Sequence, residues 1–346
     1  MLSIADAREQ WTPEGVYLNT ASYGLPPRDG FDALQAALAD WRGGRTSWEH
    51  WGESSEGARE AFARMVNTTP DRVAIGSTVS GFAGLVAASL PAGTNVLVPD
   101  VEFTSTLFPF LVQEDRGVTV TTVAPDRLAE AIDASTDVVA FSAVQMSTGE
   151  VADLDAIATA AAHHGALTLL DATQACGWLP IDATRFGAVM CSAYKWLMSP
   201  RGTSLMAVGD EWLERIVPHS AGWYAGADVH ASYFGPPLRL ADTARRLDTS
   251  PAWFSWVGTL PALELLNRIG IPAVYAHDVA LANRFRVGLD MPASDSAIVS
   301  ADIPGAEEKL ARAGVSAAMR GGRVRVSWHV YNTDADVDTA LDALSS

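Results

Sequence analysis

Short apolar runs recur through the middle of the chain, and stretches with helical spacing separate them. The runs are rich in β-branched residues and bounded by turn residues, which is typical of buried parallel strands. The segments 81–90 and 154–164 place apolar residues at helical spacing. This alternation predicts an α/β fold, with a mostly parallel seven-stranded sheet and helices on both faces. The expected strands are 73–76, 96–99, 118–123, 138–143, 166–170, 188–191 and 204–208.

The pattern changes on either side of this alternating region. Residues 1–13 are expected to form a short helix or arm, and the periodicity lapses around 241–251. Beyond that point the spacing predicts two helices followed by a small α/β domain. We therefore expect a large domain at 14–250, with 1–13 and 251–346 forming an N-terminal arm and a small C-terminal domain. The later elements are expected at 257–269, 272–289, 298–301, 307–313, 323–328 and 334–344.

Three tryptophans, Trp41, Trp48 and Trp51, stand in a stretch rich in glycine and polar residues. This composition favours a loop. Aromatic side chains in such a loop either pack against the large domain, or wall a pocket or anchor a partner subunit. The sequence leaves both alternatives open.

The overall charge narrows the class of partner. The chain has 346 residues, of which 41 are acidic and 24 basic, and its formal net charge of −17 repels nucleic acid and anionic membranes. Neither is expected as a partner. Cys176 and Cys191 are too few for a disulfide framework, and with no visible signal peptide or long apolar run we expect a cytoplasmic protein. The 7 histidines lack zinc-binding spacing, so no metal is expected.

Two ionisable residues follow neighbouring buried runs. Asp171 ends one run and Lys195 comes just beyond the next. Ligands of open α/β sheets gather at the carboxyl ends of strands, so these side chains are expected to meet on one bound molecule. An acid and an amine placed in this way suit pyridoxal phosphate, because a lysine binds its aldehyde and a carboxylate partners its pyridine nitrogen. Burial between Tyr194 and Trp196 is expected to lower the pKa of Lys195 and favour the neutral amine.

Several motifs carry a resemblance to a known family. DATQ at 171–174 is followed by SAYKW at 192–196 and SPRG at 199–202, and the flanks contain YLNTASYG at 17–24 and RVSWHVYNT at 325–333. Their order and spacing resemble the class V aminotransferase family of fold type I pyridoxal phosphate-dependent enzymes. Cysteine desulfurase, kynureninase and isopenicillin N epimerase are relatives in that family. The resemblance implies a fold type I architecture, a pyridoxal 5'-phosphate cofactor and a homodimer.

The resemblance also assigns roles to individual residues. Lys195 is expected to form the Schiff base with the cofactor and then to move the substrate α-proton. Asp171 is expected to hold the pyridine nitrogen protonated, and Gln174 to reach the phenolic oxygen of the ring. The turn at 76–81 follows a strand and opens a helix, which suits a phosphate. The remaining assignments are Ser77, Thr78, Ser192 and Tyr194 for the phosphate, Phe103 for stacking on the ring, and Arg325 for the substrate carboxylate, with Arg201 and Arg320 as further candidate anion contacts.

The chain departs from the family pattern at three places. Tyr194 stands where the family usually has histidine, and Phe103 stands where relatives place histidine or another aromatic residue. Phenylalanine stacks but cannot exchange a proton. The segment 248–253 replaces a Glu-x-Gly-Thr-Pro sequence that reaches the phosphate of the other subunit in many relatives. Thr249 or Ser250 is therefore the expected contact across the dimer.

The expected function is chemistry at the α-carbon of an amino acid, most simply transamination. Alternatives on the same scaffold are a C–S or other β-lyase, a kynureninase-like hydrolase and an epimerase. A non-catalytic binding module would need none of Asp171, Gln174, Lys195 and Arg325, and no GxGxxG motif follows a strand as a nicotinamide enzyme would require. Cysteine desulfurases need an exposed thiol on a loop shortly before the C-terminal arginine. No cysteine lies between Ile298 and Arg325, so desulfurase activity is not expected.

Overall fold

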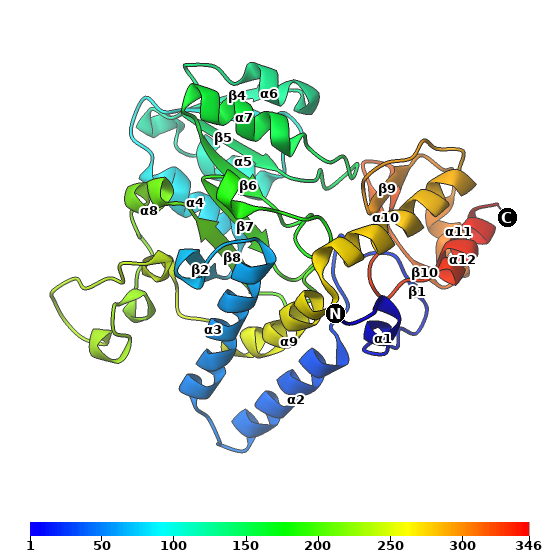
Figure 1. Ribbon diagram of the computed structural model, residues 1–346, viewed down its shortest axis with the longest axis horizontal. Helices are drawn as coiled ribbons and strands as arrows, with labels where there is room; N and C mark the ends of the chain where they lie inside the picture. The colour runs from blue at the N-terminus through cyan, green and yellow to red at the C-terminus, as the bar shows by residue number, and fades with distance from the viewer. Residues whose placement is uncertain (346) are drawn as a thin grey trace.

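The largest element in the chain is a seven-stranded sheet, seen in a computed structural model that describes residues 1–345. The strand order is β2-β8-β7-β6-β5-β3-β4, and within the described residues β8 alone runs against the others. The predicted α/β fold with a mostly parallel sheet is confirmed (Figure 1). The strands are β2 (Val73–Gly76), β3 (Asn95–Pro99), β4 (Thr119–Val123), β5 (Val138–Ser142), β6 (Leu167–Asp171), β7 (Ala188–Ser192) and β8 (Ser204–Val208).

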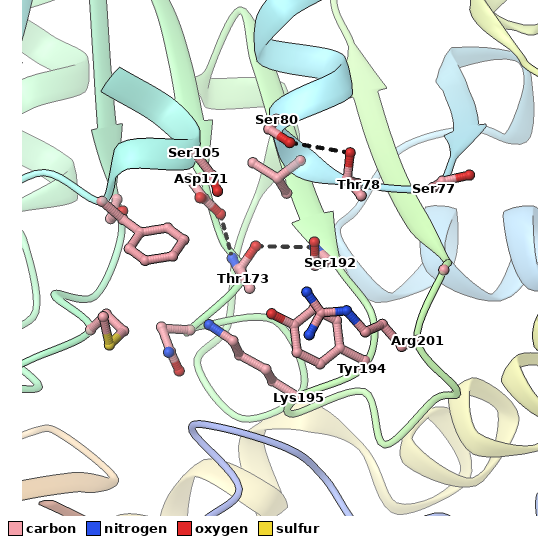
Figure 2. A pocket seen from close by; sticks show the side chains of 16 residues that line it. Ser77, Thr78, Ser80, Ser105, Asp171, Thr173, Ser192, Tyr194, Lys195 and Arg201 are labelled. Carbon is pink, nitrogen blue, oxygen red and sulfur yellow. Dashed lines mark hydrogen bonds between the residues drawn. The ribbon is translucent and has the colours of Figure 1, made fainter. Parts of the chain in front are cut away.

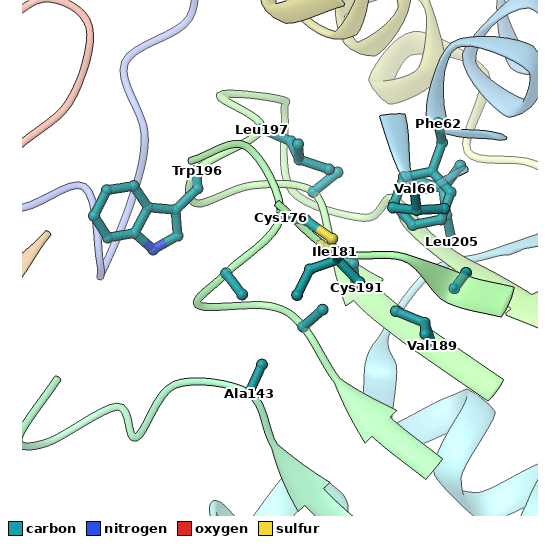
Figure 3. Packing of buried hydrophobic residues seen from close by; sticks show 14 of the residues in the cluster. Phe62, Val66, Ala143, Cys176, Ile181, Val189, Cys191, Trp196, Leu197 and Leu205 are labelled. Atoms are coloured by element: carbon teal, nitrogen blue, oxygen red, sulfur yellow. The ribbon is translucent and has the colours of Figure 1, made fainter. Parts of the chain in front are cut away.

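Both faces of this sheet are buried, each in its own hydrophobic cluster. Val189 and Cys191 of β7 belong to one cluster, which also contains Phe62 and is drawn in Figure 3. Ala188 and Met190 of the same strand belong to the other cluster. Successive residues of a strand point to opposite faces, so an uninterrupted apolar run is needed here. The helices between and after the strands are α4 (Val79–Ser89), α5 (Thr104–Leu111), α6 (Leu128–Ala131), α7 (Leu154–His164) and α8 (Asp210–Arg215).

The stretch that holds the three tryptophans is mostly helical, which corrects the loop expectation. Trp41 lies in α2 (Arg28–Arg42), Trp48 and Trp51 lie in the long helix α3 (Trp48–Met65), and only residues 43–47 between these helices form a loop. Ser47 caps α3 by accepting a hydrogen bond from the backbone N–H of His50. Buried Trp51 and Phe62 lie on the helix face that packs against α9 (Trp253–Ile269), and α2 (Arg28–Arg42) packs beside them. Trp48 meets Trp223 edge-on, with ring centroids 5.0 Å apart. Packing within the subunit is therefore the observed role of Trp48 and Trp51.

The C-terminal part of the chain builds a smaller antiparallel sheet of order β11-β12-β9. Phe285, Leu310 and Trp328 form its buried cluster together with Leu18. In Figure 1, α10 leads from α9 to this sheet. The elements are α10 (Ile271–Gly288), β9 (Ile298–Ala301), α11 (Ala306–Arg312), β10 (Val315–Ser316), β11 (Ala318–Arg320), β12 (Arg323–Ser327) and α12 (Asp334–Ser345).

The N-terminal segment pairs with the C-terminal part of the chain, in a separate two-stranded sheet, and not with the large sheet. β1 (Val16–Tyr17) pairs in parallel with β10, and α1 (Ile4–Arg8) packs near α9 and α10. The division into a large domain at 14–250 and a small domain with an N-terminal arm at 251–346 and 1–13 stays a prediction. Within residues 1–345, no helix has both the length and the apolar content needed to cross a bilayer. Short 3-10 turns lie at Pro70–Arg72, Glu114–Arg116, Pro125–Arg127, Ala183–Arg185, Trp223–Ala225, His230–Ser232 and Ala244–Leu247.

Candidate active site

A cavity opens at the carboxyl edge of the large sheet, where the parallel strands end (Figure 2). Strand register explains why its walls meet. Ser142 of β5 pairs with Asp171 of β6, while Gly76 of β2 and Ser192 of β7 both pair with Ser204 of β8. The loops that leave these strands converge on one space. The predicted site residues that line it are Ser77, Thr78, Phe103, Asp171, Gln174, Ser192, Tyr194 and Lys195.

Asp171 is a buried carboxylate held by neutral donors. It ends β6 and is 5% exposed. Its Oδ2 accepts a hydrogen bond from Thr106 Oγ1 at 3.0 Å, and its Oδ1 accepts one from the Thr173 N–H at 2.9 Å. A buried carboxylate gains most from a cationic partner, so the space beside Asp171 suits a protonated nitrogen.

Lys195 lies in a tight turn after β7 that is pressed against the N-terminal segment. The Gly24 N–H donates to the Tyr194 carbonyl at 3.0 Å. A Cβ at Gly24 would lie 2.0 Å from the Lys195 carbonyl oxygen, so only glycine fits. Met198, at the end of the turn, adopts a left-handed φ of 53°. These contacts fix the backbone from which the Lys195 amine enters the cavity (Figure 2).

The Lys195 amine is poised between its two charge states. The residue is 6% exposed, and burial lowers its pKa to about 8; Asp171 opposes this shift and Arg325 adds to it. Its Nζ lies 5.7 Å from the centroid of the Phe103 ring and 5.8 Å from that of the Tyr194 ring. A substantial fraction of the amine is therefore neutral near physiological pH, as a nucleophile or base requires.

The N-terminus of α4 forms an anion-binding end of the cavity. Thr78 Oγ1 caps the helix by accepting from the Gly81 N–H at 3.1 Å, and Ser80 Oγ donates to it at 3.3 Å. Arg201 lines the same cavity, with its guanidinium 4.7 Å from the centroid of the Tyr194 ring. Backbone N–H groups at a helix start, hydroxyls and a guanidinium together suit a phosphate.

The amide of Gln174 faces the cavity in one fixed orientation. Its Oε1 accepts from the Trp196 indole N–H at 2.8 Å, and its Nε2 donates to the Ala21 carbonyl at 2.9 Å. Because an indole N–H only donates, the amide cannot be reversed. Its second Nε2 hydrogen is left for a ligand oxygen. Nearby, the Ser192 N–H donates to Thr173 Oγ1 at 3.0 Å (Figure 2).

Arg325 lies behind the cavity lining, on β12 of the smaller sheet, and is 1% exposed. Its Nη1 donates to the carbonyl of Met146, a lining residue, at 2.7 Å, and its Nη2 donates to Ser22 Oγ at 2.7 Å. Its Nε has no hydrogen-bond partner among residues 1–345. Burial and the charge of Arg320 lower the pKa of Arg325 to about 10. The guanidinium stays charged at neutral pH and its field reaches Lys195.

Ser250 is the predicted cofactor contact that lies outside this cavity lining. It is exposed. It follows Asp248, whose buried carboxylate pairs with Arg59 at 2.7 Å and accepts from the Ile75 N–H at 2.8 Å. The segment that leads to Ser250 is thus anchored beneath β2. Its contact with the phosphate of a second subunit stays a prediction.

Sequence reasoning missed the residues that hold the predicted ones in place. Thr106 is separated from Asp171 by 65 positions, and Met146 and Ser22 are separated from Arg325 by 179 and 303 positions. For Ser22 the available signal was its place within the motif at 17–24, and for Thr106 it was the hydroxyl-rich start of α5. No local pattern indicates that the Met146 carbonyl is an acceptor.

Comparison with known proteins identifies the family of this chain. A family model described as aminotransferase class V matches residues 16–301, a span that includes Asp171 and Lys195. The chain belongs to the class V aminotransferase family. Members of this family are pyridoxal phosphate-dependent enzymes that act on amino acids, so pyridoxal phosphate is its cofactor.

The relatives carry out different reactions. The chain is 28% identical to the uncharacterized aminotransferase YcbU of Bacillus subtilis, covering 87% of this chain and 86% of that protein. It is 25% identical to isopenicillin N epimerase of Streptomyces clavuligerus, covering 96% and 95%. Among solved structures, a cystine C-S lyase in complex with cysteine persulfide is 21% identical and superposes with a TM-score of 0.86, covering 96% of this chain and 98% of that one.

The residues present fit pyridoxal phosphate. The α4 N-terminus and Arg201 suit the phosphate, and the buried Asp171 suits a protonated pyridine nitrogen. The amine of Lys195 suits the aldehyde, and the Phe103 ring offers a stacking surface. These groups line one cavity, as a single bound molecule requires.

Proposed function

We propose that this class V enzyme is an aminotransferase that acts on an amino acid. The observation that carries the proposal is the buried amine of Lys195, with a pKa of about 8, which shares a cavity with Asp171. When bound, the cofactor supplies an electron sink for the charge left on the substrate α-carbon after proton loss.

The chain's own residues bind and orient the cofactor. Lys195 holds its aldehyde carbon, and Asp171 keeps its pyridine nitrogen protonated by placing a negative charge beside it. Gln174 donates its remaining Nε2 hydrogen to the phenolic oxygen, and Phe103 covers the ring. The phosphate group is bound by Ser77, Thr78, Ser192 and Tyr194, together with the guanidinium of Arg201.

Arg325 binds the substrate and Lys195 transfers its α-proton. A guanidinium forms two parallel hydrogen bonds to a carboxylate. Arg325 therefore fixes the substrate α-carboxylate, and with it the direction of the α-proton, once that carboxylate replaces the Met146 carbonyl or the Ser22 hydroxyl as its partner. Lys195 accepts that proton as a neutral amine and returns it as an ammonium. Its pKa of about 8 lets it do both near neutral pH.

The side chain of Phe103, which lines the cavity near Lys195, favours transamination over epimerisation. Amino-group transfer needs one group that removes a proton from the substrate α-carbon and returns it to a second carbon, which is joined to the first through the amino nitrogen. Epimerisation through the opposite face needs a second proton donor, and Phe103 has no proton to give. C–S or other β-elimination and kynureninase-like hydrolysis are alternatives that the same residues support, and epimerisation is an alternative that would need a proton donor other than Phe103.

We also propose a cytoplasmic homodimer with a large domain at 14–250 and a small domain formed by 251–346 and the N-terminal arm. Trp41 and Phe234 are 57% and 87% exposed, and exposed aromatic side chains of this size are typical of subunit interfaces. In the dimer, Ser250 or Thr249 reaches the partner's phosphate site. The free, buried thiols of Cys176 and Cys191 fit a reducing compartment. Light scattering measures the oligomeric state, and a monomer at assay concentration would contradict the dimer.

Product analysis tests the reaction type. The cofactor-loaded protein is incubated with each of a panel of amino acids, with and without an added 2-oxo acid, and products are identified by mass spectrometry. Transamination predicts one 2-oxo acid and one new amino acid, with turnover that requires the added acceptor. Release of ammonia with a cleaved side chain, or a change of configuration alone, would replace the aminotransferase proposal by a lyase, hydrolase or epimerase.

A further inference from the structure

Two arginines of the smaller sheet converge on one hydroxyl group beside the cavity. Arg325 Nη2 donates to Ser22 Oγ at 2.7 Å, and Arg320 Nη2 donates to the same oxygen at 3.1 Å. The two nitrogens therefore lie within about 6 Å of each other. β11 and β12 are neighbouring antiparallel strands, which is why side chains from both reach the same point.

Neither arginine of this pair is neutralised by a neighbouring carboxylate within the described part of the chain. Some arginines elsewhere in the chain, among them Arg59, Arg64 and Arg284, do pair with carboxylates. Among residues 1–345 neither Arg320 nor Arg325 has a carboxylate within 4.0 Å, although acidic residues outnumber basic ones by 41 to 24. Adjacent like charges repel, so a site of this kind gains by binding anions.

One arginine beside the cavity is left without an anionic partner when one cofactor and one α-carboxylate are bound as proposed. In the proposed function, Arg201 and the α4 N-terminus meet the phosphate, and Arg325 meets the α-carboxylate. Arg320 has no anion left to bind. It is half-buried and shares the Ser22 hydroxyl with Arg325, whose other terminal nitrogen donates to the carbonyl of the lining residue Met146, so it lies beside the cavity rather than in bulk solvent.

We propose that the substrate carries a second anionic group, and that Arg320 with Ser22 binds it; this rests on the proposed function. The group is an oxyanion, such as a carboxylate, sulfonate or phosphonate, because a guanidinium and a hydroxyl both donate hydrogen bonds to oxygen. The substrate class is therefore acidic amino acids, and Arg320 is the residue that selects them over neutral ones.

Matched ligands without an amino group test the site without turnover. Succinate and butyrate have the same chain length, but at pH 7.5 succinate carries two charges and butyrate one. Their affinities for the cofactor-loaded protein are measured by calorimetry at fixed ionic strength. We expect succinate to bind tighter by on the order of tenfold, as a charge-assisted hydrogen bond gives. Arg320→Gln should reduce that preference to about twofold or less and leave butyrate binding nearly unchanged.

Arg323→Gln is the matched control. Arg323 pairs with Arg320 across the hairpin, but it is exposed and donates to Ser300 instead of Ser22. It should keep the full preference for succinate. Equal binding of both ligands to the unmodified protein would overturn the proposal. So would an equal loss of both in Arg320→Gln, because then both arginines hold a single carboxylate.

A second measurement separates this inference from the proposed function. The same titrations on cofactor-free protein report the anion site alone, and turnover of L-glutamate against L-glutamine reports its use. A succinate preference that depends on Arg320, in a protein that fails to bind the cofactor through Lys195, would reject the proposed function and keep the anion site. Normal transamination with no preference for the acidic substrate would reject only the second anion site.

Discussion

The turn after β7 and the strand β12 each bury one cation, yet they control its charge differently. Lys195 is held by its own turn and by close contact with Gly24, whereas Arg325 is held by Ser22 and Met146. Burial lowers the pKa of both side chains, to about 8 for Lys195 and to about 10 for Arg325. Near neutral pH the amine exchanges a proton while the guanidinium keeps its charge. Similar burial therefore yields a proton carrier in one region and a fixed anion contact in the other.

Removing the amine of Lys195 should have the largest effect on turnover. Lys195→Ala should abolish covalent attachment of the cofactor and lower turnover by roughly a thousandfold or more, because no other amine lines the cavity. The chain has only one other lysine, Lys309, which donates to the Leu344 carbonyl in the small domain. Borohydride reduction followed by peptide mass spectrometry locates the cofactor. Lys309→Ala should label like the unmodified protein, and label on a peptide without Lys195 would refute the assignment.

Removing the fixed charge should have a smaller effect. In Arg325→Ala the α-carboxylate loses a charge-assisted hydrogen bond of roughly 1.5 to 3 kcal/mol, so kcat/KM should fall on the order of ten- to a few hundred-fold. Steady-state kinetics with an α-amino acid measures the loss. Arg323→Ala, which removes an exposed arginine two residues away, should change it little. Unchanged turnover in Arg325→Ala would mean that the carboxylate binds elsewhere.

The charges of Arg325 and Asp171 act on the pKa of Lys195 in opposite directions, so removing each one should shift that pKa with opposite sign. Cyanate reacts with neutral amines, so carbamylation of Lys195 in cofactor-free protein should rise with pH through a midpoint of about 8. Arg325→Met removes a cation that disfavours the ammonium, so the midpoint should move up. Asp171→Asn removes an anion that favours it, so the midpoint should move down. Lys309 in the same digest is the internal reference. Shifts of the same sign in both variants would contradict the coupling.

The contrast between Lys195, which is held by its own turn, and Arg325, which is held by distant segments, also explains which site residues could be predicted from the sequence. Asp171, Lys195 and Thr78 stand at the ends of strands or at the start of a helix, where local pattern and parallel topology decide position. The sheet followed from the alternation of short apolar runs with helical spacing. For Arg325 the motif predicted a role in binding, but its partners come from segments folded against it from far along the chain.

The regions that could not be predicted depend on packing rather than on local pattern. The stretch 41–51 favours a loop because glycine and polar residues surround its tryptophans. α3 begins within that stretch, at Trp48, and its buried face includes Gly52, Ser55 and Arg59, which weaken the hydrophobic period. Arg59 pairs with Glu56 on the same helix and also with Asp248, which is 189 positions away and is indicated by no local pattern. Ser250 follows that same aspartate, and its role depends on a second subunit.

The smallest effect is expected from the two thiols beneath the turn that carries Lys195. Cys176 and Cys191 are 1% and 0% exposed and lie in the buried cluster of Figure 3. Burial raises the pKa of the Cys191 thiol, and the neighbouring Cys176 adds to the shift, so no reactive thiolate is available to take sulfur from a substrate. A Cys176→Ser, Cys191→Ser variant should therefore keep its kcat/KM within about twofold.

Stability must be separated from catalysis in that test. Two buried hydroxyls lower the free energy of unfolding, roughly 1 to 3 kcal/mol for each one left without a partner. The matched Cys176→Ala, Cys191→Ala variant removes both thiols without adding a polar group, and thermal denaturation compares the two. A persulfide trapped on either cysteine after incubation with L-cysteine, with turnover lost in both variants, would make this chain a desulfurase. Retained turnover in the alanine variant would confine the chemistry to Lys195 and Arg325, the two cations whose different pKa values set their separate tasks.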